Sequence, residues 1–339
     1  MQNRVVYGVY AAGLAKLGET TFIPIHGLQN INISTNFNLE AVFEIGQAAV
    51  YQLVEELPDV QVSLSKVLDG WPLIYHLATN GATSGSIAGR AGIRTILAMS
   101  IFNDVQDNAS GTPLTQCECS GLFVNSVSYT FPADGNATEE VTLVGNNKIY
   151  RASAFTFSGS TLNSVFTSND APIGYLGSVV RRQHFDFGVS RLPPSLPGIS
   201  SSGTNNSNSD GFYNCSIQNA SVSWDLGRQN INELGHKGPY FRYPTPNVEV
   251  NTTFEVVSKS GDNVYATEAG ILGNGNNLSN ETIILRSLDS TKIDCGTKNK
   301  MVSSSISNGS TGGDIQTLSF SYQGYNVAIV THSSDPSGL

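Results

Sequence analysis

The chain has 339 residues, enough for two domains of ordinary size, each with a core of its own. Only 13% of the residues are charged, and Asp and Glu outnumber Lys and Arg to give a formal net charge of -9. Because affinity for nucleic acid comes mainly from clustered Lys and Arg, this balance argues against a protein that grips DNA or RNA.

The sequence also lacks the signatures of an enzyme or a metal protein. It contains no GxxxxGK[ST] loop, no HExxH and no GxSxG elbow. The cysteines have neither CxxC spacing nor a His placed to complete a zinc site, so we expect buried thiols at Cys117, Cys119, Cys215 and Cys295. We therefore expect no catalytic residue, no metal, no cofactor and no membrane span.

In chain order, the first informative element is the alternating segment from Asn30 to Leu39. Apolar or β-branched residues occupy every second position, and the positions between them hold Asn or Ser. This period predicts a half-buried β-strand. A solvent-facing strand usually carries Lys, Glu and Arg, whereas this polar side is neutral. The simplest interpretation is an exposed sheet face that happens to be rich in Asn.

A partner strand is predicted over 60–65, after a connection at 40–58 that is longer than an ordinary hairpin loop. A short helix is expected at 71–79, where Pro72 stands near the first turn. A buried strand from Arg94 and a hairpin over 117–145 complete the first half.

The second half repeats the first in order and spacing, which indicates a duplicated unit. Residues 217–235 match 28–46 at a constant offset, and "PNVEV" from Pro246 answers "PDVQV" from Pro58 after the loss of one residue. The second unit then contains a long connection at 230–246, a weaker helix at 263–270, a strand from Glu281 and a hairpin over 300–324, so that the two units run in parallel.

A segment rich in Gly, Ser and Asn lies between the two units. It spans 195–211 and is predicted to be a linker or an exposed loop. The chain then divides into a first domain over 1–194, which includes an N-terminal arm, and a second over 212–339.

The stretch from Gly27 to Leu77 resembles the tail tube proteins of tailed bacteriophages. The shared features are a long strand pair separated by an extended loop, then "DG", a short helix and further strands. The resemblance implies a mainly β fold of two tandem tube-like β-sandwich or half-barrel domains, each with a short helix. Most members form rings of six single-domain chains. This chain is more similar to the duplicated form, which implies a pseudo-sixfold ring of three chains, with a hexamer as the alternative.

The resemblance gives the neutral strand face a purpose. Rings of this family stack into a tube through which DNA leaves the virion, so the wall must be wet without binding phosphates. The residues that we expect on this wall are Asn30, Asn32, Ser34, Asn36, Gln61, Ser63, Ser65, Asn219, Ser221, Ser223, Asp225, Glu249, Asn251 and Glu255. Those that we expect in ring-to-ring contacts are Phe43, Ile45, Val50, Tyr51, Leu53, Tyr240, Phe241 and Tyr243, which are more apolar than a free loop requires.

As a structural virion protein, the chain would be made in the bacterial host cytoplasm and would assemble with itself and with other tail proteins. DNA would pass through the lumen without specific binding. Two alternatives remain at this stage. A tail hub or tube initiator with tandem tube domains differs in copy number, and a secreted glycan-binding β-sandwich would show a cleaved signal peptide, disulfides or bound carbohydrate.

Overall fold

The computed structural model is mainly β, as predicted from the sequence. It describes residues 8, 10–102, 113–151, 156–157, 179–186, 190–200, 202–205, 215–236, 238–245, 247–257, 278–307 and 316–338. Within these residues, no helix has both the length and the apolar character needed to cross a membrane.

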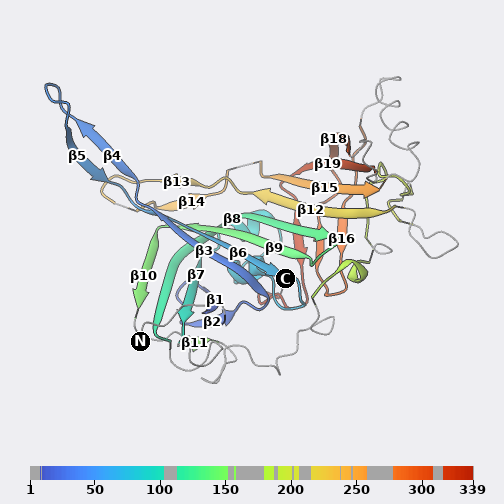
Figure 1. Ribbon diagram of the computed structural model, residues 1–339, viewed down its shortest axis with the longest axis horizontal. Coiled ribbons are helices and arrows are strands. Elements are labelled where there is room, and N and C mark those ends of the chain that lie inside the picture. Colours follow the sequence, from blue (N-terminus) through green and yellow to red (C-terminus); the bar gives the residue numbers. More distant parts are fainter. Residues whose placement is uncertain are drawn as a thin grey trace.

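The fold is organised by a continuous antiparallel sheet of eight strands, which we call the main sheet (Figure 1). Its strand order is β3-β6-β9-β8-β12-β15-β19-β18. The strands are β3 (Leu28–Asn36), β6 (Asp59–Val67), β8 (Thr115–Pro132), β9 (Thr138–Gly145), β12 (Ile217–Asp225), β15 (Glu249–Val257), β18 (Lys300–Ser307) and β19 (Thr317–Tyr325). These strands cover the predicted strand at 60–65 and the predicted hairpins at 117–145 and 300–324. The strand predicted over 30–39 is shorter than expected, because β3 ends at Asn36 and Leu39 begins another strand.

The same succession of strands occurs twice in the main sheet. The order β3-β6-β9-β8 from the first half is followed by β12-β15-β19-β18 from the second, and the β8–β12 pair joins them. Bulges fall at equivalent places, at Gln29 and Gln218 and again at Asn125 and Val302. The bulges also correct the sequence alignment, because they set Asp59 against Glu249, a shift of two residues from the match of "PDVQV" with "PNVEV".

Strand β8 belongs to two layers. Its second part lies in the main sheet, whereas its first part pairs with β7 on one side and β10 on the other. Strand β7 in turn pairs with β1, and β1 pairs with β2. Gly121, with a φ of +69°, lies where the first part ends, and the bulge at Asn125 lies near the start of the second; together they allow the long strand to change direction. The strands of this second layer are β1 (Tyr10–Lys16), β2 (Thr21–Pro24), β7 (Thr95–Ile101), β10 (Asn147–Arg151) and β11 (Thr156–Phe157).

The chain has two short helices, α1 (Ile74–Ala78) and α2 (Ile87–Ala91), in its described residues. Helix α1 lies against β8 and β9 on the apolar side of the main sheet, and Ile87 and Ala91 of α2 belong to the same core. Helix α1 confirms the helix predicted at 71–79. Its counterpart at 263–270, like the turn of the hairpin at 300–324, lies outside the described residues. The fully buried carboxylate of Glu139 accepts hydrogen bonds from the backbone N–H groups of Ile74 and Tyr75, at 2.6 and 3.0 Å, and thereby caps α1 from the sheet.

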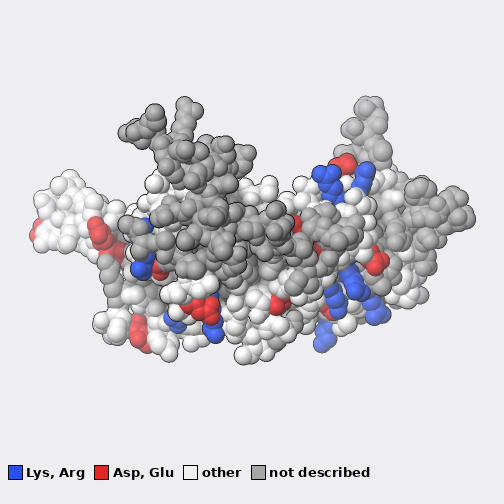
Figure 2. All heavy atoms as spheres, turned by 90° about the horizontal axis from the view of Figure 1, so that it is seen from below, with Lys and Arg blue, Asp and Glu red and all other residues white. Residues whose placement is uncertain are grey.

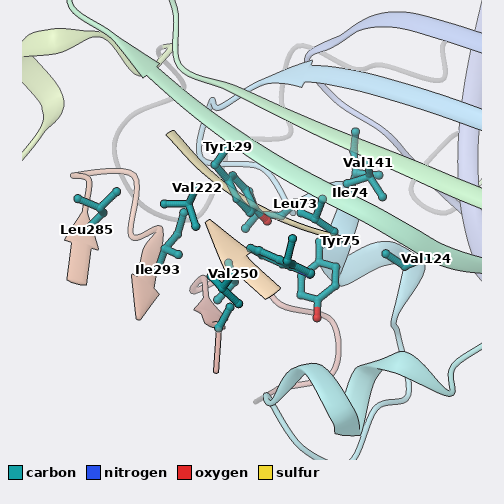
Figure 3. Packing of buried hydrophobic residues seen from close by; sticks show 14 of the residues in the cluster. Leu73, Ile74, Tyr75, Val124, Tyr129, Val141, Val222, Val250, Leu285 and Ile293 are labelled. Atoms are coloured by element: carbon teal, nitrogen blue, oxygen red, sulfur yellow. The ribbon is translucent and has the colours of Figure 1, made fainter. Parts of the chain in front are cut away.

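One apolar core serves both halves of the chain. Figure 3 shows Tyr129 of the first half beside Val222 of the second, and Val141 and Val250 belong to the same core. The Trp224 ring packs against Tyr75 and Tyr129, at centroid distances of 5.6 and 6.0 Å. The two halves therefore share packing within the chain.

Two polar contacts also tie the C-terminal segment to the first half. Arg90, which is buried in α2, pairs with Asp335 at 2.5 Å. The His76 ring Nε2 lies 3.1 Å from the carbonyl oxygen of Val330 in β20 (Ile329–Thr331). The C-terminal segment is thus held against α1 and α2 of the first half.

The remaining elements are short. Strands β16 (Ile284–Arg286) and β17 (Lys292–Asp294) form a small sheet with β20, and a 3₁₀ turn, η3, spans Arg182–His184. Part of the predicted linker at 195–211 is described, and it packs against the second half: Ser195 Oγ donates to Glu281 at 2.8 Å, and Leu196 is buried.

Two hairpins extend from the end of the main sheet. They are β4 (Leu39–Phe43) with β5 (Val50–Glu55), and β13 (Gln229–Ile231) with β14 (Phe241–Tyr243). They occupy the long connections predicted at 40–58 and 230–246. The β4–β5 hairpin projects furthest, at the left of Figure 1.

Candidate functional site: the polar face of the main sheet

The main sheet has one apolar face and one polar face. Paired residues of an antiparallel sheet share a face, so the register can be followed from strand to strand. One row crosses the whole sheet, and its members are Asn30, Ser65, Glu140, Ser128, Ser223, Asn251, Gln323 and Lys300. The polar face is therefore one continuous surface built by both halves.

Every residue that the sequence predicted for a channel wall lies on this face. In β3, for example, Asn30, Asn32, Ser34 and Asn36 are exposed while the alternate residues are half-buried. The predicted residues of the first half, on β3 and β6, are separated from those of the second, on β12 and β15, by the strands β9 and β8. That this face lines a channel stays a prediction.

Sequence reasoning selected no residue from four strands of the same face. The missed residues are mostly Ser and Thr, and they include Ser126, Ser128, Thr130, Thr138, Glu140 and Thr142 from β8 and β9, and Ser303, Ser305, Ser319, Ser321 and Gln323 from β18 and β19. The alternation of the two hairpins was the signal that could have identified them.

The electrostatic character of the face is neutral to acidic. The structure describes all eight strands in full, and their cations are Lys66, which is buried on the apolar side, and Lys300. Two of its acids receive hydrogen bonds from neutral donors: Glu249 from the Asn251 amide at 2.8 Å, and Asp225 from the Gly227 N–H at 2.8 Å. Apart from Lys300, the face therefore presents no cation to a phosphate.

The β13–β14 hairpin is anchored to the first half at its base. Arg242 pairs with Asp59 at 2.6 Å and donates to the Asn146 side-chain oxygen at 2.9 Å. Burial raises the pKa of Asp59, but the hydrogen bonds from Arg242 and Asn38 outweigh that effect and leave the pKa below its ordinary value. This contact fixes the base of the hairpin on the end of β6 and β9.

Phe241 packs edge-on against Phe123 of β8, with ring centroids 5.0 Å apart, and is half-buried. The other residues predicted for ring-to-ring contacts are exposed. In the β4–β5 hairpin, Ile45 is fully exposed and Phe43 is 64% exposed. This hairpin contains no Lys or Arg, and it forms the mostly uncharged projection at the far left of Figure 2. Its apolar surface lacks a cover among the described residues.

No arrangement for catalysis emerges from this surface. Among the described residues, no group of three or more His, Cys, Asp or Glu side chains could hold a metal ion. All four cysteines are buried, as expected. What the face offers chemically is a wide hydrogen-bonding surface of hydroxyls and amides.

Comparisons with known proteins give low similarity. No family model matches the sequence, and no curated protein matches it. Among solved structures, the chain is similar to the anti-feeding prophage cap, a tube-terminating cap, with 14% identity and a TM-score of 0.33 over 45% of this chain and 94% of that one. It is also similar to a chain of the sheath–tube complex of the PVC extracellular contractile injection system, with 15% identity and a TM-score of 0.33 over 45% and 95% of the two chains. A chain from the tail of an empty GTA particle shows 8% identity and a TM-score of 0.26 over 34% and 83%.

Proposed function

We propose that this protein is a structural tail tube subunit, which joins edge to edge with its own copies into rings whose polar faces line a channel for DNA. The observation that carries the proposal is the continuous polar face of the main sheet. A face this wide, with hydroxyls and amides in place of Lys and Arg, suits a surface that must remain wet beside a polyanion without holding it.

The repeated strand order supports a ring of three chains. Each chain supplies two successive four-strand units to the sheet, so three chains supply the six units of a pseudo-sixfold ring. Three times eight strands would make a barrel of 24 strands. Barrels of about 16–18 strands already leave an aqueous channel, so a larger barrel leaves an open lumen. A ring of six chains is the alternative outcome of the test below.

Closure of the ring also accounts for the two ends of the sheet. An open sheet with long edge strands is prone to pair with other chains, whereas a closed barrel has no edges. The tips of the two hairpins would contact the next ring, and the exposure of their apolar residues, among them Phe43, Ile45 and Tyr240, supports this role. The protein would act in the virion tail after synthesis in the host cytoplasm, with other tail proteins as partners and with no enzymatic activity.

Native mass spectrometry with negative-stain electron microscopy of the purified chain tests this function. We expect closed rings of three chains, each of 36.1 kDa, or stacks of such rings. Rings of six chains would keep the tube and correct the stoichiometry. A protein that remains monomeric at high concentration would contradict the proposed function, and a single ring that caps but never stacks would favour the hub.

A further inference from the structure

Both outer edges of the main sheet are open in the described part of the chain. There, β3 pairs only with β6, and β18 only with β19. The apolar side is incompletely covered at these edges: Ile306 of β18 is 59% exposed and Ile33 of β3 is half-buried. In addition, the Thr35 hydroxyl of β3 is buried without a hydrogen-bond partner. An orphaned buried hydroxyl is costly, which points to a missing partner on this edge.

The chain already contains the joint that would satisfy both edges. Within one chain, β8 of the first half pairs with β12 of the second in seven consecutive residue pairs. On the polar side Ser128 stands opposite Ser223, and on the apolar side Tyr129 stands opposite Val222, both fully buried. This joint shows how the end of one four-strand unit fits the start of another.

We propose that β18 of one copy pairs with β3 of the next in the register of the internal β8–β12 joint. The proposal rests on the proposed function and specifies its partner, a second copy of this chain. The aligned bulges at Asn125 and Val302 make β18 the counterpart of β8, and those at Gln218 and Gln29 make β3 the counterpart of β12.

Transfer of the register fixes each contact at the seam. Ser305 faces Ser34 of the next copy on the polar side, in place of Ser128 and Ser223. On the apolar side, Ile306 faces Ile33, so two incompletely covered side chains bury each other. Ser304 faces Thr35, and its hydroxyl gives the orphaned Thr35 hydroxyl a partner of the kind that cross-strand Thr and Ser commonly form. Apolar therefore meets apolar and polar meets polar along the seam.

The hairpins extend the same correspondence. The β13–β14 hairpin covers Phe123 of β8, and the counterpart of Phe123 at the open edge is Lys300, which is exposed. The hairpin that would cover Lys300 is β4–β5 of the next copy, which carries Glu40, Glu44 and Glu55 and no cation. An acidic hairpin over the cation removes the one positive charge of the polar face from the lumen.

Paired cysteine substitutions test the register, since a disulfide forms only between closely placed residues. The variant S34C/S305C should form intermolecular disulfides under mild oxidation and run as a cross-linked ladder on a denaturing gel. The variant S128C/S223C, at the matched internal position, should form an intramolecular disulfide and should therefore run as a monomer on the gel. The variant N30C/S305C is misaligned by four residues, roughly 13 Å, and should not cross-link.

Two outcomes would overturn the seam while leaving the proposed function intact: rings in which N30C/S305C cross-links more than S34C/S305C, and rings in which neither links although S128C/S223C does. Failure of every variant and of the unsubstituted protein to assemble would overturn both proposals. Ile306→Asp adds an independent measurement. It should abolish rings with an unchanged unfolding midpoint, whereas Leu288→Asp, at an exposed site away from β18, should assemble normally.

Discussion

Glu139 is the side chain on which the contact between the main sheet and α1 depends, and its removal gives a sharp test of the fold. Its carboxylate is fully buried, and it accepts from the N–H groups of Ile74 and Tyr75 and from the Tyr129 hydroxyl at 2.9 Å. Burial raises the pKa of Glu139, while the Lys66 ammonium acts in the opposite direction.

Replacement of Glu139 by Ala would leave three buried donors without an acceptor. At about 1–3 kcal/mol for each unsatisfied group, with some relaxation, the free energy of unfolding should fall by about 3–6 kcal/mol. The neighbouring Glu140 is a matched control, because it has the same side chain on the exposed polar face. Glu140→Ala should change stability by no more than about 0.5 kcal/mol.

Urea denaturation followed by circular dichroism would measure both variants. A lower midpoint at an unchanged slope would report a loss of stability in the folded state. The reasoning would be refuted if Glu139→Ala lost less than about 1 kcal/mol, or if Glu140→Ala lost as much as Glu139→Ala.

Three further predictions concern pH, the hairpin anchor and the lumen. Burial lowers the pKa of His76 from 6.5 to about 4, so the unfolded state binds the proton more readily than the folded state. The free energy of unfolding should therefore fall by up to about 3 kcal/mol as the pH drops from 6.5 to 4. Urea midpoints measured across this pH range would check it, and their dependence on pH should be weaker in His76→Gln. Arg242→Ala should lower the free energy of unfolding by only about 1 kcal/mol, because the Asp59 carboxylate that it leaves without a cation is nearly half exposed to water. It should raise the pKa of Asp59 in an NMR titration, and an unchanged pKa would contradict the assignment. The variant N32K/N251K should give the purified chain salt-dependent affinity for duplex DNA by fluorescence anisotropy, whereas N32Q/N251Q should not; equal binding by both would refute the role given to charge.

The regular parts of the fold could be predicted because a period of two is visible in the sequence. Alternation from Asn30 to Asn36 identified both the strand and its polar side. The pattern could not show which of the adjacent acids Glu139 and Glu140 is buried, because both have the same side chain. Only the register of β9 places Glu139 in the core and Glu140 on the polar face.

Long-range contacts were beyond the reach of local pattern. The pair of Arg90 with Asp335 joins residues that no spacing rule connects, and it depends on how the C-terminal segment returns beneath the sheet. The sequence match of the two units after the long connection was also wrong by two residues. It set Pro58 against Pro246, whereas the strand pairing beside the equivalent bulges sets Asp59 against Glu249. Insertions and deletions in a loop change the spacing between matching strands in the sequence, whereas the hydrogen-bonded strand pairs keep the same register in the structure.

A cryo-electron microscopy map of the assembled rings would show whether the polar face of the main sheet lines a channel. We expect Asn30, Ser128 and Asn251 to point into the lumen of every ring, with apolar residues such as Val62 and Val222, which are buried within the chain, turned away from it. A map in which these polar side chains face the outside of the assembly would rule out a channel lined by this face.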